Sequence, residues 1–213
     1  MIDQQIPIEG GDHVWIVSRS RPETLQLDDG VNRYWIKADL ASVEAGNKIA
    51  DAFNDTALDV LIYNVGIWES SGFREDYDFE QDDPAEIANI LNVNVVSAIT
   101  CIQRLLPNLK KSDNAKIILI GSTAGLENNH FTQVSFAASK FGLRGIGNSL
   151  REHVKLAKDV PSPTMYKVDL ERLCNVTLRT MKYITGTNRS RIVHHQSATG
   201  WSDVLAVMLC RWQ

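Results

Sequence analysis

The sequence predicts one α/β domain in which short buried strands alternate with amphipathic helices. Residues 117–120 form a continuous, mostly β-branched run that ends at Gly121, a pattern typical of a strand buried on both faces of a sheet. The proline-free segment 133–157 then repeats apolar residues at helical spacing. A hydroxyl at the strand end, Ser122, and a lysine on the helix, Lys140, therefore converge on one candidate site.

Length and composition suit a single domain over residues 1–213, because 44% of the 213 residues are hydrophobic. The formal net charge is -4 and the lysines and arginines are scattered, so we expect a small-molecule ligand and neither nucleic acid nor a membrane surface. The longest apolar runs are far shorter than the ~20 residues that span a bilayer. Residues 1–10 contain no apolar signal core, so a cytoplasmic protein is expected.

Cysteine and histidine spacing gives no sign of a metal site. Cys101, Cys174 and Cys210 lack metal-ligand spacing and indicate a reducing compartment, and each can equally be a small buried apolar residue. His194 and His195 are adjacent and would point to different sides of a strand or helix. No metal is therefore expected.

The remaining elements follow from periodicity and turn residues. Strands are expected within 13–20, 33–38, 59–67 and 163–168, and helices over 42–53, 84–106 and from residue 202 onward. Ser42 and Asp83 are the expected N-caps of the first two helices, and Pro107 is expected to end the second. The last helix rests on the amphipathic spacing of Val204, Leu205, Val207, Met208 and Trp212.

Ser122 at a strand end and Lys140 on the next helix resemble the site of the short-chain dehydrogenase/reductase family, which pairs such a serine with Tyr-x-x-x-Lys. The resemblance implies a Rossmann-like fold, a mostly parallel sheet flanked by helices on both faces. It also implies that Ser122 binds the substrate oxygen, Lys140 holds the nicotinamide ribose and Asn94 completes a water relay. The alternatives are a surface lysine and an asparagine bound to a neighbouring backbone group.

Phe136 stands where the family has its tyrosine, four residues before Lys140 and therefore on the same helix face. In the family the tyrosine hydroxyl is the general acid or base, and the lysine ammonium lowers the pKa of that hydroxyl. Phenylalanine cannot transfer a proton. Loss of a general acid typically slows a reaction ~10²- to 10⁴-fold.

The resemblance also assigns residues to the cofactor. In a Rossmann-type sheet, a cation at the end of the second strand pairs with the additional phosphate of NADP, whereas an acid accepts the ribose hydroxyls of NAD. Arg19 therefore favours NADP(H) over NAD(H), and the alternative is a surface arginine beside a turn. Asp39 can likewise be a simple strand-end or helix-capping aspartate. The implied cofactor-binding residues are Ser18, Arg19, Asp39, Leu40, Asn64, Val65, Gly66 and Lys140.

The resemblance covers 13–168, whereas 1–12 and 169–213 are atypical. The family begins with a strand, a glycine-rich phosphate loop and a helix, for which the twelve residues before His13 are too few. The first strand, central in the family's sheet, is therefore expected to be missing, and another segment must fill its place in the hydrogen bonding. Residues 183–189 are one candidate, and can equally be a remnant of the family's C-terminal segment.

Two functions remain open. The first is an NADP(H)-dependent oxidoreductase that acts on a carbonyl or secondary alcohol and is impaired by Phe136. The second is an inactive scaffold, either a binding or regulatory subunit or a truncated enzyme. In the family the helices that carry Asn94 and Lys140 pack against a second subunit, so the resemblance implies a homo-oligomer.

Overall fold

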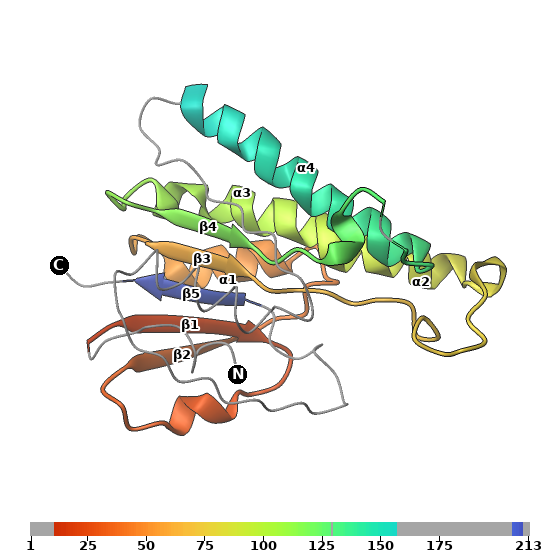
Figure 1. Ribbon diagram of the computed structural model, residues 1–213. Helices are drawn as coiled ribbons and strands as arrows, with labels where there is room; N and C mark the ends of the chain where they lie inside the picture. The colour runs from red at the N-terminus through yellow and green to blue at the C-terminus, as the bar shows by residue number, and fades with distance from the viewer. Residues whose placement is uncertain (1–10, 129, 157–205, 211–213) are drawn as a thin grey trace.

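The computed structural model describes residues 11–128, 130–156 and 206–210, which form a five-stranded sheet with helices packed against it (Figure 1). The strand order is β2-β1-β5-β3-β4. The strands are β1 His13–Ser18, β2 Asn32–Lys37, β3 Val60–Tyr63, β4 Lys116–Leu119 and β5 Ala206–Cys210. β1 pairs with β2, and β3 with β4, in parallel, in agreement with the predicted class. The strand expected at 163–168 lies outside the described residues.

β5 occupies the centre of the sheet and runs antiparallel to both of its neighbours. Its Val207 lies opposite Ile16 of β1 and Ile62 of β3. The backbone groups of β5 thus complete the hydrogen bonding of two strands that would otherwise face a gap. Residues 206–210 thus take the central position for which the sequence predicts a replacement segment, and the other candidate, 183–189, lies outside the described residues.

The amphipathic helix predicted from residue 202 is wrong over 206–210, where the chain forms β5. Ala-Val-Met-Leu-Cys is a short apolar run, which periodicity alone cannot assign to a helix or a strand. A central strand buries both of its faces and satisfies its backbone on both edges, whereas a surface helix would bury only one stripe. The vacant edges of β1 and β3 therefore decide its conformation.

The described residues form four α-helices and several shorter helical segments. These are α1 Ala45–Phe53, α2 Pro84–Leu91, α3 Ser97–Leu109 and α4 Val134–Leu156, with the turns η2 Glu23–Gln26, η3 Phe79–Gln81 and η5 Thr123–Gly125. A π-helical segment, η4 Asn92–Val96, joins α2 to α3. The helix predicted over 133–157 is thus confirmed, and the one predicted over 84–106 is a helix interrupted by a wider turn.

The two predicted N-caps have different outcomes. Asp83 caps α2, because its carboxylate accepts the N–H of Ala85 at 2.9 Å and Pro84 occupies the first helical position. Ser42 does not cap α1, which begins only at Ala45. Its hydroxyl instead accepts the N–H of Glu44 at 3.3 Å. This local bond holds the segment before α1 in a turn that competes with helix formation.

Pro107 does not end its helix, since α3 continues to Leu109. Proline removes one N–H donor from a helix, which is a small loss in the last turn. Asn108 and Leu109 are both buried, so their packing retains that turn. The predicted end of the helix, at residue 106, is therefore three residues too early.

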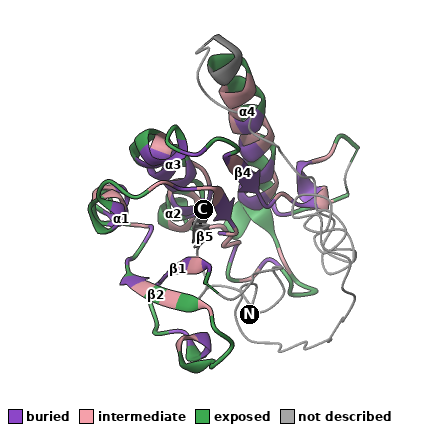
Figure 2. Cartoon of the chain, turned by 90° about the vertical axis from the view of Figure 1, so that its left-hand side faces the viewer, coloured by how far each residue is buried: buried purple, intermediate pink, exposed green. Residues whose placement is uncertain are grey.

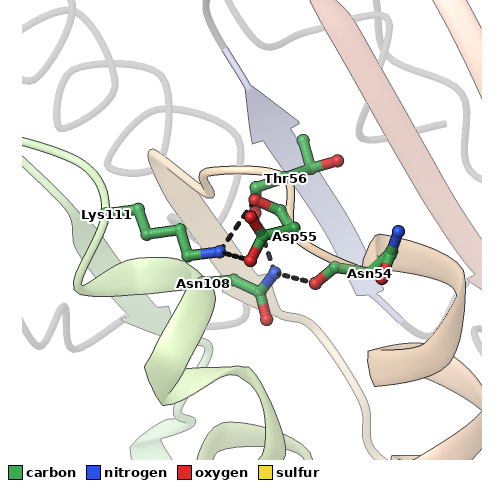
Figure 3. Close-up of polar contacts among 5 residues, drawn as sticks. All are labelled: Asn54, Asp55, Thr56, Asn108 and Lys111. Atoms are coloured by element: carbon green, nitrogen blue, oxygen red, sulfur yellow. Dashed lines mark hydrogen bonds and ion pairs between the residues drawn. The ribbon is translucent and has the colours of Figure 1, made fainter.

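The last turn of α3 also holds the loop between α1 and β3 (Figure 3). Asn108 Nδ2 donates to the carbonyl oxygens of Asn54, at 3.0 Å, and Thr56, at 2.8 Å. Beside it, Lys111 Nζ donates to the carbonyl oxygen of Asp55 at 2.9 Å and pairs with the Asp55 carboxylate. One asparagine thus supplies donors for two backbone acceptors at the entrance to β3.

Helices α1, α2 and α3 lie on one side of the sheet, and α4 packs against α2 (Figure 2). The core residues between them and the sheet include Val17, Ile49, Phe53, Leu105 and Leu119. Ile16, Ile62 and Ile118, which alternate with core residues along their strands, are buried as well. Both faces of the inner strands are therefore buried, as predicted. Helices on the second face are not found among the described residues.

The helical run Pro84–Leu109 is long and apolar enough to cross a membrane by length and composition. The core helix of a soluble protein passes the same test, and the inner residues Ile90, Ile102 and Leu105 of this run are buried in the protein. The expectation that the protein does not enter a membrane stays a prediction.

Replacing Asn108 with alanine is expected to lower the free energy of unfolding by about 1–3 kcal/mol, because two backbone carbonyls lose their donor. Urea unfolding followed by circular dichroism measures the change. Asn114→Ala, at an exposed position, is the matched control and should alter stability by less than about 0.5 kcal/mol. Equal stabilities of the two variants would contradict the role given to Asn108.

Candidate active site

The predicted catalytic lysine lies across the ends of two parallel strands. Lys140 Nζ donates to the carbonyl oxygen of Ile120, directly beyond β4, at 3.2 Å. It also donates to the carbonyl oxygen of Val65, beyond β3, at 3.4 Å. The carboxyl ends of parallel strands meet at one edge of a sheet, so α4 delivers the ammonium to the edge where α/β proteins bind their ligands.

Lys140 is buried, with only 5% of its surface exposed. Burial disfavours the charged ammonium and lowers the pKa of Lys140 from 10.5 to about 8. The Phe136 ring, one helical turn earlier, has its centroid 5.4 Å from Nζ. The aromatic ring therefore occupies the predicted place beside the ammonium, and it offers a π face where the family has a hydroxyl.

Ser122 follows β4 and begins the turn η5. Its Oγ accepts the N–H of Ala124 at 3.2 Å, and the residue is nearly buried. The hydroxyl hydrogen of Ser122 has no acceptor among the described residues. Ser122 can therefore donate to a substrate oxygen, as the resemblance implies, although this role stays a prediction.

Gly125 brings η5 against α4. A Cβ at this position would lie 2.8 Å from the carbonyl oxygen of Lys140 and 3.2 Å from its Cβ. Only glycine allows such a close approach of two backbones. The turn that carries Ser122 and the helix that carries Lys140 are thereby held together.

Asn94 joins three parts of the site from within η4. Its Nδ2 donates to the carbonyl oxygen of Ile67 at 2.8 Å and to Ser139 Oγ at 2.9 Å. Its Oδ1 accepts the N–H of Ile67 at 2.8 Å. The side chain thus ties the loop after β3 to α4, which agrees with the backbone-bound alternative. One lone pair of Oδ1 is left for a water, so the predicted relay stays open.

The π-helical turn at Asn94 has a local cause. The carbonyl oxygen of Val93 accepts hydrogen bonds from Tyr63 Oη, at 2.8 Å, and Ser97 Oγ, at 2.6 Å. These hydroxyls take the place of the usual backbone donor, and the N–H of Ser97 bonds to Asn92 one residue further back. Burial raises the pKa of Tyr63, so the hydroxyl stays protonated and keeps donating. Such π-bulges are frequent at functional sites.

A buried glutamate that the sequence did not reveal holds the start of α4. Glu69 is fully buried, and its Oε1 accepts the N–H groups of Ser135, at 2.9 Å, and Phe136, at 3.0 Å. Its Oε2 is buried and has no hydrogen-bond partner within the described part of the chain. The adjacent Trp68 meets the Phe136 ring edge-on, with centroids 6.2 Å apart. The sequence around Glu69 contains no pattern that predicts this cap, because the helix that it caps begins far along the chain.

The predicted cofactor residues of the first two strands lie at the carboxyl ends of β1 and β2. Ser18 is buried, and its Oγ donates to the Ser20 carbonyl at 2.6 Å and accepts from Trp35 Nε1 at 3.0 Å. Arg19 is exposed. Asp39 accepts the N–H of Ala41 at 3.0 Å in a turn, and Leu40 belongs to the core. Ser18, Asp39 and Leu40 thus have structural roles, and their contact with a cofactor stays a prediction.

The predicted cofactor residues after β3 lie beside the Lys140 ammonium. Asn64 and Gly66 are half-buried and Val65 is buried. A Cβ at Gly66 would lie 3.1 Å from Lys140 Nζ, and one at Gly121 would meet no atom within 4 Å. Only glycine at position 66 therefore leaves the Lys140 ammonium its place at the strand ends.

The pyrophosphate end of a dinucleotide meets a different surface. At the carboxyl ends of β1 and β3, Ala206 of β5 stands between Val17 and Tyr63. Because β5 is antiparallel, it presents its amino end here. Within 11–128, 130–156 and 206–210, no glycine-rich loop follows a strand at this edge. The described residues therefore match a dinucleotide site only at Lys140 and the strand ends beside it.

A cavity of about 490 Å³ lies beside the site, between the loop after Ser122 and the start of α4. Its lining includes the apolar Phe73, Leu126 and Phe131 and the polar Thr123 and Gln133. Thr123 follows Ser122, and Gln133 precedes α4. The residues next to Ser122 in the chain therefore line the cavity, and the Ser122 hydroxyl is the group that would donate to a substrate oxygen.

Gly125→Ala is expected to destabilise the protein by about 1–3 kcal/mol, because its Cβ would overlap the Lys140 backbone. Thermal unfolding followed by circular dichroism measures the loss. Gly145→Ala is the matched control within α4: its Cβ meets nothing within 4 Å, and alanine favours the helix by up to about 1 kcal/mol. A Gly125 variant as stable as the Gly145 variant would show that the close approach is not required.

The lowered pKa of Lys140 makes stability depend on pH. Between the folded value of about 8 and the unfolded value of 10.5, the unfolded chain binds more protons, so the free energy of unfolding rises with pH. The whole rise is on the order of 3 kcal/mol. Urea unfolding of the protein and of Lys140→Met from pH 7 to 10.5 isolates this term, because other groups cancel. A pH-independent difference between the two would contradict a lowered pKa.

Comparison with known proteins places the chain in a family. The family model for the short chain dehydrogenases matches residues 8–160. A 3-dehydrosphinganine reductase of Arabidopsis thaliana is 28% identical over 156 residues, which are 69% of this chain and 44% of the relative. A rhamnolipid-biosynthesis 3-oxoacyl-[acyl-carrier-protein] reductase of Pseudomonas aeruginosa is 27% identical over 158 residues, 69% of this chain and 59% of the relative. The chain thus spans about half the length of these curated relatives.

Solved structures have the same fold. The Pseudomonas aeruginosa RhlG/NADP active-site complex aligns with a TM-score of 0.59 and 24% identity, over 70% of this chain and 59% of that one. The NADH-dependent reductase A1-R' complexed with NAD aligns with a TM-score of 0.60 and 22% identity, over 73% and 67%. These alignments confirm the Rossmann-like fold. With a family model matched across most of its length, the chain belongs to the short chain dehydrogenase family.

Proposed function

We propose that the chain is a slow NADP(H)-dependent oxidoreductase that reduces a carbonyl compound or oxidises the corresponding secondary alcohol. The observation that carries this proposal is the buried Lys140 ammonium at the ends of β3 and β4, where Gly66 lies close against Nζ and a Cβ at Gly121 would meet no atom within 4 Å. A buried cation with no carboxylate partner among the described residues suits a ribose hydroxyl.

The cofactor supplies a hydride when it is bound. Lys140, Gly66 and Asn64 would hold its nicotinamide ribose, and the exposed Arg19 would pair with the additional phosphate of NADP(H). Related structures contain NADP in one case and NAD in another, so the preference for NADP(H) rests on Arg19.

Ser122 orients the substrate. Its Oγ accepts the N–H of Ala124. Its own hydroxyl hydrogen would then donate to the carbonyl oxygen of the substrate. The adjoining cavity of about 490 Å³ has Phe73, Leu126 and Phe131 on its apolar side, and the rest of its lining is polar and includes Glu127, so it suits a carbonyl compound that carries both apolar and polar groups. A 3-oxoacyl compound is the substrate class we propose, in line with the names of the reductases that resemble the chain.

The substrate is a small molecule, and the protein acts in the cytoplasm without nucleic acid or membrane. We further propose a homo-oligomer, because Leu91, Val96, Ile99 and Phe141 of helices α2 to α4 and η4 are exposed apolar residues.

A second function, a binding or regulatory scaffold, is favoured by Phe136. Its ring is buried, packs edge-on against Trp68 and bears no group that could transfer a proton. The amino end of β5, where the family has its phosphate loop, also favours this alternative.

Titration of the purified, folded protein with NADPH, followed by the fluorescence of the nucleotide, tests the proposal. Micromolar binding is expected, and Arg19→Ala should weaken NADPH binding while leaving NADH binding unchanged. No binding up to millimolar NADPH would rule out the oxidoreductase and favour the scaffold.

Phe136→Tyr is expected to raise the rate of NADPH oxidation ~10²- to 10⁴-fold with the N-acetylcysteamine thioester of acetoacetate, because it restores a general acid beside Lys140. Phe141→Tyr, on the same helix but 38% exposed, is the matched control and should not change the rate. If Phe136→Tyr binds NADPH and shows no faster turnover, Phe136 is not the impairing residue.

A further inference from the structure

The cavity between the loop after Ser122 and the start of α4 combines aromatic rings with a carboxylate. Phe73, from the loop after β3, and Phe131, from the loop before α4, are both part of its lining, and Glu127 is the acid. None of its described lining residues is a lysine or an arginine. Aromatic faces attract cations, and a carboxylate adds the opposite charge. This set of side chains therefore favours a positively charged organic ligand.

The Glu127 carboxylate is accessible to such a ligand. Its side chain is 83% exposed, and its ion pair is with Arg144, whose Nη2 lies 4.0 Å from Oε1. The guanidinium of Arg144 is engaged elsewhere, because Nη1 donates to the Gly125 carbonyl at 2.7 Å and Cζ lies 5.4 Å from the centroid of the Phe141 ring. An exposed pair at this separation is weak. A ligand cation can therefore replace Arg144 beside Glu127 at little cost.

The Phe73 ring is positioned before a ligand arrives. Trp68 meets it edge-on, with centroids 5.2 Å apart, and 64% of Phe73 remains exposed. The preceding residue, Gly72, accepts a hydrogen bond from Gln133 Nε2 through its carbonyl oxygen, and a Cβ at Gly72 would lie 2.9 Å from Gln133 Cγ. Two walls of the cavity are thus joined directly, which lowers the cost of ordering the site when a ligand binds.

The chain that continues from Phe73 adds negative charge. Residues 75–83 contain six aspartates and glutamates and no lysine or arginine. Arg74 precedes them and pairs with Asp76 at 2.7 Å. Charge of one sign beside a cavity raises the local concentration of ligands of the opposite sign and lowers that of ligands of the same sign. Anionic carriers of an acyl group are therefore disfavoured here.

We propose that this cavity binds an organic cation, and that the substrate is a 3-oxoacyl compound with an alkylated or protonated amine at its other end. The inference rests on the proposed function in placing the carbonyl group of this compound at Ser122. Phe73 and Phe131 contact the substituents of the amine, and Glu127 balances its charge. Ligands that end in a carboxylate or a phosphate meet the Glu127 carboxylate and are rejected.

Three N-substituted acetoacetamides of similar size, which end in a trimethylammonium, a tert-butyl or a carboxylate group, test the proposal without any nucleotide. Ligand-detected NMR titration gives their dissociation constants for the unmodified chain. The cation should bind about tenfold more tightly than the anion at low salt, and this ratio should approach one at about 0.5 M salt. It should also bind about two- to fivefold more tightly than the uncharged tert-butyl compound.

Variants assign the preference to the lining. Glu127→Gln should reduce the ratio of cation to anion affinity to less than about threefold, and Phe131→Leu should remove the preference for trimethylammonium over tert-butyl. Glu152→Gln is the matched control, since the same charge is lost at an exposed position of α4, about 27 Å along the helix from Val134. It should leave both ratios unchanged, as should His130→Gln in the lining. Circular dichroism checks that each variant is folded.

The outcomes separate this inference from the proposed function. Equal binding of the three compounds, tighter binding of the carboxylate, or a preference that Glu127→Gln does not reduce overturns the cation site, and so does failure of all three to bind at millimolar concentration. The NADPH titration then still decides the proposed function. A cation preference in a chain that does not bind NADPH supports the cavity as a cation site and overturns its role in an oxidoreductase.

Discussion

The described structure depends on the hydrogen bonding of β5. Without Ala206–Cys210, the described sheet would be two separate parallel pairs, β1 with β2 and β3 with β4. The two halves of the candidate site are divided in the same way: Arg19 and Asp39 lie at the first pair, and Ser122 and Lys140 at the second. An antiparallel strand joins them because the backbone groups on both facing edges require partners. The same strand places an amino end where a phosphate loop would follow a parallel strand.

The half of the candidate site around Lys140 is built from contacts between the backbone and a few buried polar side chains. Lys140 reaches two strand ends, Asn94 ties the loop after β3 to α4, and Glu69 holds the first turn of α4. Each of these bonds links an element to a segment distant in sequence. The position of the ammonium is therefore determined by the whole arrangement of β3, β4, η4 and α4, and Gly125 allows its closest approach.

Phe136 gives this arrangement an aromatic neighbour that cannot transfer a proton. The ring is buried, meets Trp68 edge-on and has its centroid 5.4 Å from Lys140 Nζ. A buried ammonium surrounded by carbonyls and an aromatic ring has its pKa lowered by desolvation alone. The same burial that makes the charge costly for stability also makes it a better acid, which links the stability of the fold to the chemistry of the site.

The sequence by itself determined the α/β class, the buried strand at 117–120, the Asp83 cap and the placing of Ser122 and Lys140 at one strand end, because these follow from local periodicity and chain order. Tertiary structure decided what local patterns leave open. Residues 206–210 became a strand because two edges lacked partners, Pro107 stayed within α3 because Asn108 and Leu109 are buried, and Glu69 capped a helix 65 residues ahead. Such outcomes depend on groups far apart in sequence, which no local pattern contains.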